Sequence, residues 1–136
     1  MGIINIVKNV KDIHKDYIVL VKVGNFYNVY GRDAYIVSYL LDYKITLLDN
    51  NIYNCSFPKS AYNKVVAIIE NNKINYIVLD KRNNYDVENK YNYKNLNKYD
   101  EVYKIAKVKI AKKMRIEKIK KYLLSCDNEE IIFEVE

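Results

Sequence analysis

The chain of 136 residues has little glycine, proline and cysteine and no tryptophan. Its three glycines, at positions 2, 24 and 31, form neither a phosphate-binding G-x-x-x-x-G-K loop nor a G-x-S-x-G nucleophile elbow. The two cysteines, Cys55 and Cys126, form no C-x-x-C pair, and the single histidine, His14, has no second histidine beside it. We therefore expect no metal site, no cofactor and no disulfide framework.

A catalytic constellation is also missing from the sequence. Asp12 and Asp16 flank His14, but at the end of a helix they are expected to be solvated charges. Asp33 and Asp42 could lie near each other, yet a carboxylate pair without a third ligand is a weak signature of a metal-dependent nuclease. We expect that the protein is not an enzyme.

No long apolar run is present. The first ten residues are interrupted by Asn5, Lys8 and Asn9, and they lack the apolar core and cleavage site of a signal peptide. No stretch approaches the roughly 20 apolar residues that span a membrane. Together with the sparse cysteines, which fit a reducing compartment, this favours a cytoplasmic protein that does not bind membranes.

The charge of the chain is unevenly distributed. Hydrophobic residues make up 50% of the sequence, which is enough for the core of one domain. The net charge of +6 is weak support for a polyanionic partner, because an AT-rich genome alone would enrich lysine, asparagine and tyrosine. Residues 98–121 carry ten basic and three acidic side chains, whereas residues 127–136 carry five acids and no base. The basic excess is therefore concentrated in one segment.

Hydrophobic periodicity and turn signals predict a mixed α/β (α+β) fold, in which helices flank a single mixed sheet. The β-branched run 17–23, the turn Gly24-Asn25 and residues 26–30 predict a hairpin. A helix follows to about residue 41, with Asp33 as its expected N-cap. The other expected elements are helices over 3–14, 60–71 and 98–124, strands over 43–48, 52–55 and 74–79, and a short final strand within 129–136. We divide the chain into a core (1–82), a surface connection (83–97, beginning near residue 81) and a basic helix with an acidic terminal strand packed on the same domain (98–136).

Two motifs of this core resemble a known family. The stretch G-N-F-Y-N-V-Y (24–30), followed by Asp33-Ala34 and Leu40-Leu41-Asp42, resembles the signature G-D-F-Y-E-L-F, D-A and L-L-D of the mismatch-recognition domain (domain I) of the DNA repair protein MutS. Phe57-Pro58 with Ala61, and then residues 77–80, resemble the family's I-P-Y-H-A helix and V-A-I-C-E strand. The resemblance covers about residues 3–82.

The resemblance implies a role in mismatch repair, with double-stranded DNA as the partner. In the family the phenylalanine of F-x-E wedges beside a mispaired base and the glutamate hydrogen-bonds that base; Phe26 and Asn28 occupy these positions here. Residues i and i+2 of a strand share a face, so these two side chains should project together. A wedge kinks DNA most cheaply where base pairing is already lost.

The sequence departs from the family pattern at several positions. Asn28 replaces the glutamate, and Lys59-Ser60 replaces the Y-H pair. We expect Lys22, Arg32 and Lys59 to contact phosphates, with Ser60 beside them. The 136 residues of the chain contain none of the ATPase, clamp and connector regions of MutS. We therefore expect a stand-alone module that does not couple recognition to ATP.

Two interpretations of the basic helix stay open. Its stripe of Val102, Ala106, Ile110 and Met114 is expected to pack on the sheet or on a second copy, whereas its lysine-rich face could follow a phosphate backbone. The alternative to DNA binding is a protein-interaction or structural module that kept the fold, with a homodimer or a protein partner docked on residues 98–124. Burial of the Phe26 side chain would exclude the wedge.

Overall fold

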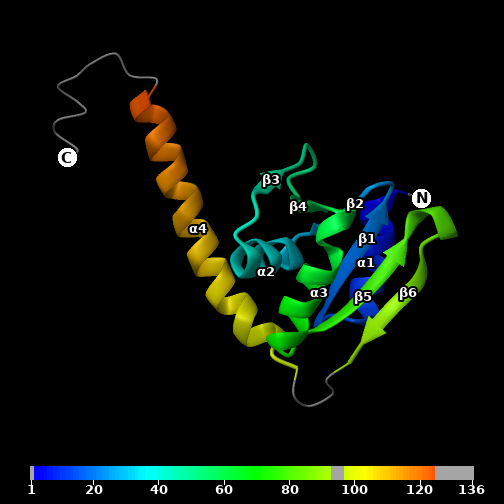
Figure 1. The fold of residues 1–136 in the computed structure, drawn as a ribbon. Helices are drawn as coiled ribbons and strands as arrows, with labels where there is room; N and C mark the ends of the chain where they lie inside the picture. The colour runs from blue at the N-terminus through cyan, green and yellow to red at the C-terminus, as the bar shows by residue number, and fades with distance from the viewer. Residues whose placement is uncertain (1, 93–96, 125–136) are drawn as a thin grey trace.

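The structure, a computed structural model, describes residues 2–92 and 97–124. The described residues form one six-stranded sheet and the helices around it (Figure 1). The elements are α1 (Ile3–Ile13), β1 (Tyr17–Val23), β2 (Phe26–Tyr30), α2 (Arg32–Leu41), β3 (Ile45–Leu47), β4 (Tyr53–Pro58), the short 3-10 helix η1 (Lys59–Ala61), α3 (Tyr62–Asn71), β5 (Asn75–Asp80), the 3-10 helix η2 (Lys81–Asn83), β6 (Asp86–Tyr91) and α4 (Tyr99–Leu124).

The sheet is mixed, as the sequence predicted. Its strand order is β3-β4-β2-β1-β5-β6, in which β1 and β5 are parallel and the other neighbours are antiparallel. Both strands of the parallel pair lie in the interior of the sheet, and their residues are buried on both faces, from Ile18 to Val21 in β1 and from Asn75 to Leu79 in β5. Uninterrupted apolar runs of this kind are typical of strands that are covered on both sides.

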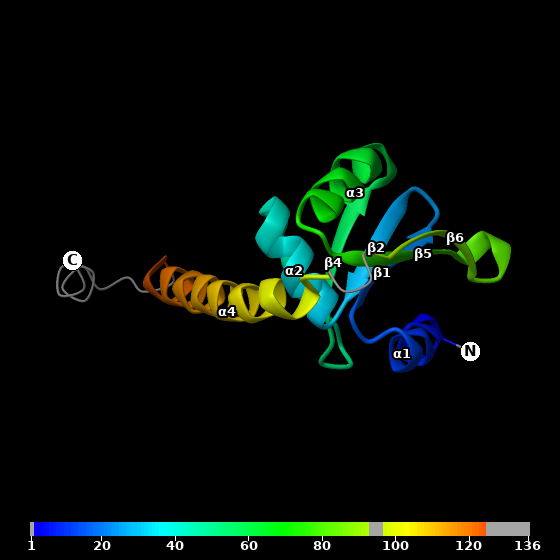
Figure 2. The same cartoon turned by 90° about the horizontal axis from the view of Figure 1, so that it is seen from below.

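Helices cover the two faces unequally. Figure 2 shows α1 alone on one face and α2 and α3 on the other. The α1 face is a small cluster in which Val7 packs on Val19, Val21, Ile77 and Leu79. The opposite face holds the larger core, to which β1, β2, β4, β5 and the helices α2, α3 and α4 all contribute. Residues of β2 therefore alternate between the main core and the α1 side of the sheet.

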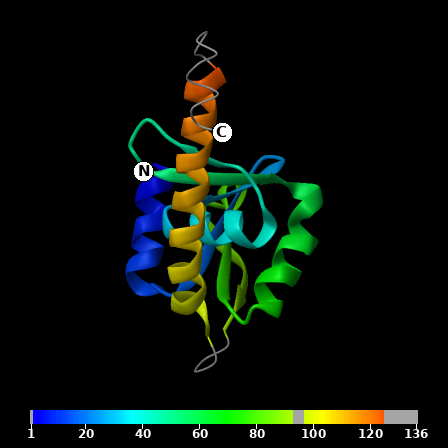
Figure 3. The ribbon, with the colours of Figure 1, turned by 90° about the vertical axis from the view of Figure 1, so that its left-hand side faces the viewer.

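The long helix α4 confirms the expected helix and its apolar stripe. Ala106 and Ile110 are buried, and Val102 and Met114 are partly buried. The stripe packs against α2, whereas the sequence left open the sheet and a second copy. The C-terminal turns of α4 extend beyond the rest of the domain (Figure 1 and Figure 3), and there Ile119 is 55% exposed.

Residues 81–92 are more regular than the surface connection that we expected. They contain η2 and the edge strand β6, which pairs antiparallel with β5. All six residues of β6 are exposed, so its side chains carry no hydrophobic alternation that would reveal a strand. Backbone pairing with β5, a tertiary contact, organises it. The final strand expected within 129–136 lies outside the described residues.

The expected N-cap role of Asp33 is wrong. Gly31 is the N-cap of α2, and Asp33 lies in the first turn with its carboxylate fully buried. Its Oδ2 accepts a hydrogen bond from Val19 N (2.9 Å), and its Oδ1 accepts from Lys11 Nζ (2.9 Å) and from the Tyr99 hydroxyl (2.6 Å). One carboxylate thus connects α1, β1, α2 and α4. Burial raises the pKa of Asp33, and Lys11 opposes that shift.

The suspected pair of Asp33 and Asp42 is not formed. The two residues lie at opposite ends of α2, about 13 Å apart at 1.5 Å per residue. Asp42 is exposed and forms an ion pair with Lys113 (2.7 Å). Within residues 2–92 and 97–124, no group of three potential metal ligands comes together. No helix among these residues is long and apolar enough to cross a membrane.

Candidate nucleic-acid interface

Phe26 stands at the tip of the β1–β2 hairpin. Gly24 adopts φ +61° in the turn, a conformation that side chains disfavour, and Phe26 is the first residue of β2. The Phe26 side chain is 53% exposed, whereas the next residue, Tyr27, is 4% exposed and belongs to the main core. The ring is therefore open to solvent on the α1 side of the sheet.

The strand beneath Phe26 is firmly held. Tyr27 stacks between Phe57 and Tyr62, with ring centroids 5.5 and 4.8 Å away. Lys59 N donates a hydrogen bond to Asn25 O (2.8 Å), which ties the start of η1 to the turn. Burial raises the pKa of Tyr27 to about 12. Phe26 therefore rests on a packed support, which reduces the entropy lost when it contacts a ligand.

Asn28 shares the face of Phe26 and is paired with a polar residue of β4. The β2–β4 register places Asn28 opposite Ser56, whose Oγ donates to Asn28 Oδ1. Asn54 Nδ2 in turn donates to Ser56 Oγ (3.1 Å). The Nδ2 group of Asn28 is a donor, and its oxygen keeps a second lone pair as an acceptor. The glutamate at this position in the resemblance could only accept when ionised.

Sequence reasoning missed Ser56 and Asn54. Their alternation with the buried Cys55 and Phe57 was a usable signal for a strand with one polar face. The sequence could not show that β4 pairs with β2, because a connection of more than twenty residues separates the two strands.

The structure groups most of the other candidate residues around the hairpin. Lys59 and Ser60 are exposed and follow Pro58, which is opposite Phe26 in the sheet. Lys22 is paired with Tyr27, so it lies on the other face of the sheet from Phe26. Lys22 and Lys59 still meet, since both line a small cavity at the end of the hairpin.

Arg32 is separated from this group. It begins α2 beyond the opposite end of β2, and its guanidinium lies over the Tyr103 ring, 5.2 Å from the ring centre. A cation held over an aromatic face in this way helps to fasten α4 to α2. The structure therefore places Arg32 away from Phe26.

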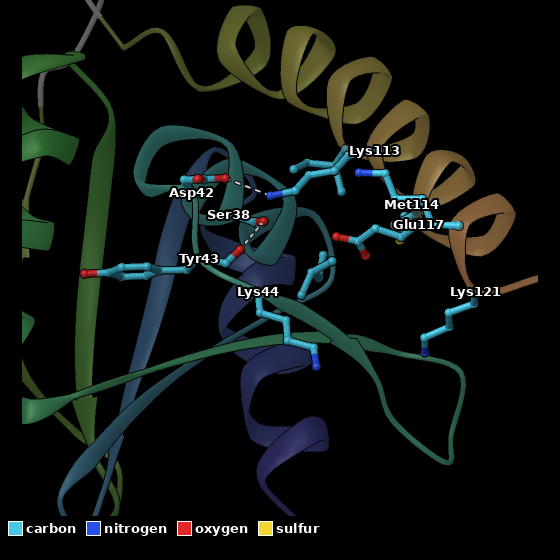
Figure 4. Close-up of a pocket in the computed structure, with 11 residues that line it drawn as sticks. Ser38, Asp42, Tyr43, Lys44, Lys113, Met114, Glu117 and Lys121 are labelled. Atoms are coloured by element: carbon cyan, nitrogen blue, oxygen red, sulfur yellow. Dashed lines mark hydrogen bonds and ion pairs between the residues drawn. The ribbon is translucent and has the colours of Figure 1, made fainter. Parts of the chain in front are cut away.

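A second, larger cavity lies between α2, β3 and α4 (Figure 4). Its volume is about 450 Å³, and none of its lining residues belongs to the β1–β2 hairpin. Lys113 points toward Asp42, and this contact lowers the pKa of the Asp42 carboxyl. Lys44, Lys120 and Lys121 also line the cavity. Part of the basic face of α4 therefore lines a cavity that the β1–β2 hairpin does not form.

The fold and this surface define a class: a mixed α/β domain that presents an aromatic side chain and polar and basic groups at one hairpin. Comparison with protein families identifies the family to which this domain belongs: residues 1–107 match the family described as MutS domain I. The chain belongs to this family. The match extends beyond residue 82, where the motif resemblance ended, and includes β6 and the first turns of α4. No match is found among curated proteins.

Family membership confirms the resemblance drawn from the two motifs. The fold is that of a mismatch-recognition, DNA-binding domain, and this domain of MutS is non-catalytic. DNA is accordingly the partner that the family supports.

Proposed function

We propose that the protein acts as a stand-alone module that binds mispaired or distorted duplex DNA, with Phe26 as an aromatic wedge. Membership of the MutS domain I family supports DNA as the ligand. The observation that carries the proposal is the 53% exposure of Phe26 at the hairpin tip, beside buried aromatic neighbours. An aromatic side chain of this size normally stabilises a protein or an interface by being buried.

Discrimination would arise from the cost of deforming DNA. Stacking of one aromatic side chain on a base contributes about 1–3 kcal/mol. Insertion between paired bases also costs unstacking energy, and this cost is lower where the pair is already broken. The same contact therefore yields more net binding at a mismatch than in a regular duplex.

The remaining candidate residues would assist Phe26. Asn28 would donate a hydrogen bond from Nδ2 to an acceptor atom of the displaced base. Lys59, Ser60 and Lys22 lie around the hairpin and would contact phosphates, which position the domain without reading sequence. Arg32 would contribute less, because its guanidinium already lies over Tyr103.

The test compares a homoduplex with a duplex that carries one mismatch, by fluorescence anisotropy at fixed salt. Wild type is expected to prefer the mismatch, and Phe26→Ala should lose about fivefold to a hundredfold of its affinity for it, equivalent to the stacking energy. Tyr39→Ala removes another exposed ring, on α2, and should bind as wild type does. Equal affinity of wild type and Phe26→Ala for the mismatched duplex would reject the wedge.

A second candidate function is a protein-interaction module that uses α4. One observation favours it: α4 exposes large apolar side chains, namely Ile105, Val108, Ile116, Ile119 and Leu124. Self-association through this surface would bury them. Sedimentation of the full chain tests it against a Val108→Glu/Ile119→Glu variant. Association of wild type but not of the variant supports the candidate, and a monomer at all concentrations refutes self-association.

A further inference from the structure

A small basic cavity lies at the end of the β1–β2 hairpin, behind the turn that carries Phe26. Its lining comes from four parts of the chain: Lys22 at the end of β1, Gly24 and Asn25 in the turn, Lys59 at the start of η1, and Asp80 with Arg82 around the start of η2. We call it the tip cavity. Its volume is about 60 Å³, far below the roughly 300–1,000 Å³ of cavities that enclose organic ligands. It therefore suits one small group.

The charges around the tip cavity favour an anion. Its lining residues include three with cationic side chains, Lys22, Lys59 and Arg82, and one with a carboxylate, Asp80. An oxygen of that carboxylate already accepts a hydrogen bond from the backbone nitrogen of Arg82 (2.9 Å), which fixes the start of η2. Arg82 is exposed, so its guanidinium is accessible to a ligand. A guanidinium with two ammonium groups is a strong combination for a phosphate group.

The position of the cavity relative to Phe26 identifies the source of that phosphate. Asn25 lines the cavity, and Phe26 is the next residue. Lys22 lies on the face of the sheet opposite Phe26, so the hairpin tip separates the wedge from the cavity. A DNA strand whose base contacts Phe26 would run past this tip with its backbone nearby.

We propose that the tip cavity binds a phosphodiester of the DNA strand contacted by Phe26, with Arg82 and Lys22 as its principal ligands and Lys59 at its rim. This inference rests on the proposed function and adds Arg82, a residue that the sequence did not single out. The phosphate contact does not depend on base identity or on pairing. It anchors the domain on any duplex and leaves discrimination to Phe26.

The experiment measures the salt dependence of homoduplex binding for wild type, Lys22→Ala, Arg82→Ala and the double variant. The matched control is Lys15→Ala, which removes one exposed cation in the turn before β1; the strand from Tyr17 to Lys22 alone spans about 17 Å at the rise of a strand. Because one phosphate is involved, the double variant should reduce the slope of log K against log salt by about one. The control should keep the wild-type slope, and circular dichroism confirms that each variant is folded.

Each result separates the tip cavity from the wedge. Loss of affinity by the same factor on homoduplex and mismatched duplex supports the cavity, because a phosphate contact leaves the ratio of the two affinities unchanged. A slope for the double variant equal to that of Lys15→Ala would overturn the inference, even where Phe26→Ala abolishes mismatch preference. Equal wild-type affinity for both duplexes would instead contradict the proposed wedge, and the slope on homoduplex would still test the cavity.

A further arm distinguishes the phosphodiester from free phosphate. Inorganic phosphate replaces part of the chloride at constant ionic strength while homoduplex binding is measured. Unchanged binding supports the DNA backbone as the ligand, because one phosphate gains little without the rest of the duplex. Displacement of DNA from wild type, but not from Arg82→Ala, would also support it, because DNA and phosphate would then compete for the tip cavity. Equal DNA affinity of wild type and Arg82→Ala, with inorganic phosphate bound by wild type alone, would overturn that assignment in favour of free phosphate.

Discussion

The buried carboxylate of Asp33 provides the sharpest test of how the domain is held together. Asp33→Ala removes the acceptor of three hydrogen bonds, donated by Val19 N, Lys11 Nζ and the Tyr99 hydroxyl. Removal of one partner from a buried ion pair costs about 3–5 kcal/mol, because the other charge is left uncompensated. The Lys11 side chain is 22% exposed and also donates to Tyr17 O, so we expect the lower end, about 3 kcal/mol.

Urea unfolding followed by far-ultraviolet circular dichroism measures this loss. With a slope of about 2 kcal/mol per molar, a loss of about 3 kcal/mol lowers the midpoint by about 1.5 M. The control is Asp42→Ala, which breaks the exposed ion pair with Lys113 and should leave the midpoint unchanged. An unchanged midpoint for Asp33→Ala would refute the view that this carboxylate connects the helices.

A double variant examines the cause of the loss. Lys11→Met with Asp33→Leu removes both charges and fills the space with apolar groups, which often restores stability. Val19 N would still lack its acceptor, so about 1–3 kcal/mol of the loss should remain. A double variant less stable than Asp33→Ala would show that the uncompensated charge is not the main term.

Three further predictions concern packing and ionisation. Ile110→Ala should cost about 2–4 kcal/mol in urea unfolding because Ile110 is 4% exposed where α4 meets α2, whereas Ile119→Ala, at 55% exposure, should cost little; equal effects would contradict the packing. Burial raises the pKa of the Cys55 thiol to about 12, so in a Cys126→Ser variant thiol reagents should label the chain only after unfolding, and rapid native labelling would disprove this. Burial raises the pKa of Tyr27 to about 12, so the stability that its neutral hydroxyl contributes below pH 10 is lost between pH 10 and 12. The free energy of unfolding of Tyr27→Phe should fall less than that of wild type over this window, and equal falls would refute the prediction.

Much of the fold follows from local patterns in the sequence. The apolar runs of β1 and β5, the turn at Gly24-Asn25 and the stripe of α4 are each confirmed, because periodicity and turn chemistry are properties of neighbouring residues. Family membership was also recognisable from two short motifs. The edge strand β6 was missed, since its exposed side chains carry no pattern.

The candidate site was only partly predictable for the same reason. The two-residue period of a strand already puts Phe26 and Asn28 on one face. The register between β2 and β4 then decides that Ser56 lies beside Asn28. That register joins segments far apart in the chain, so no local pattern contains it.

By itself, the sequence determined most of the helices and strands and which residue lies at the hairpin tip, because these depend on interactions between near neighbours. The edge strand β6 is the exception, since its pairing with β5 organises it. The tertiary structure alone decided that Asp33 is a buried acceptor rather than a helix cap. It also decided that Arg82 joins Lys22 at the tip cavity while Arg32 lies over Tyr103. The physical reason is that burial and charge pairing arise when distant segments pack together, and no local sequence pattern reveals which side chains will meet.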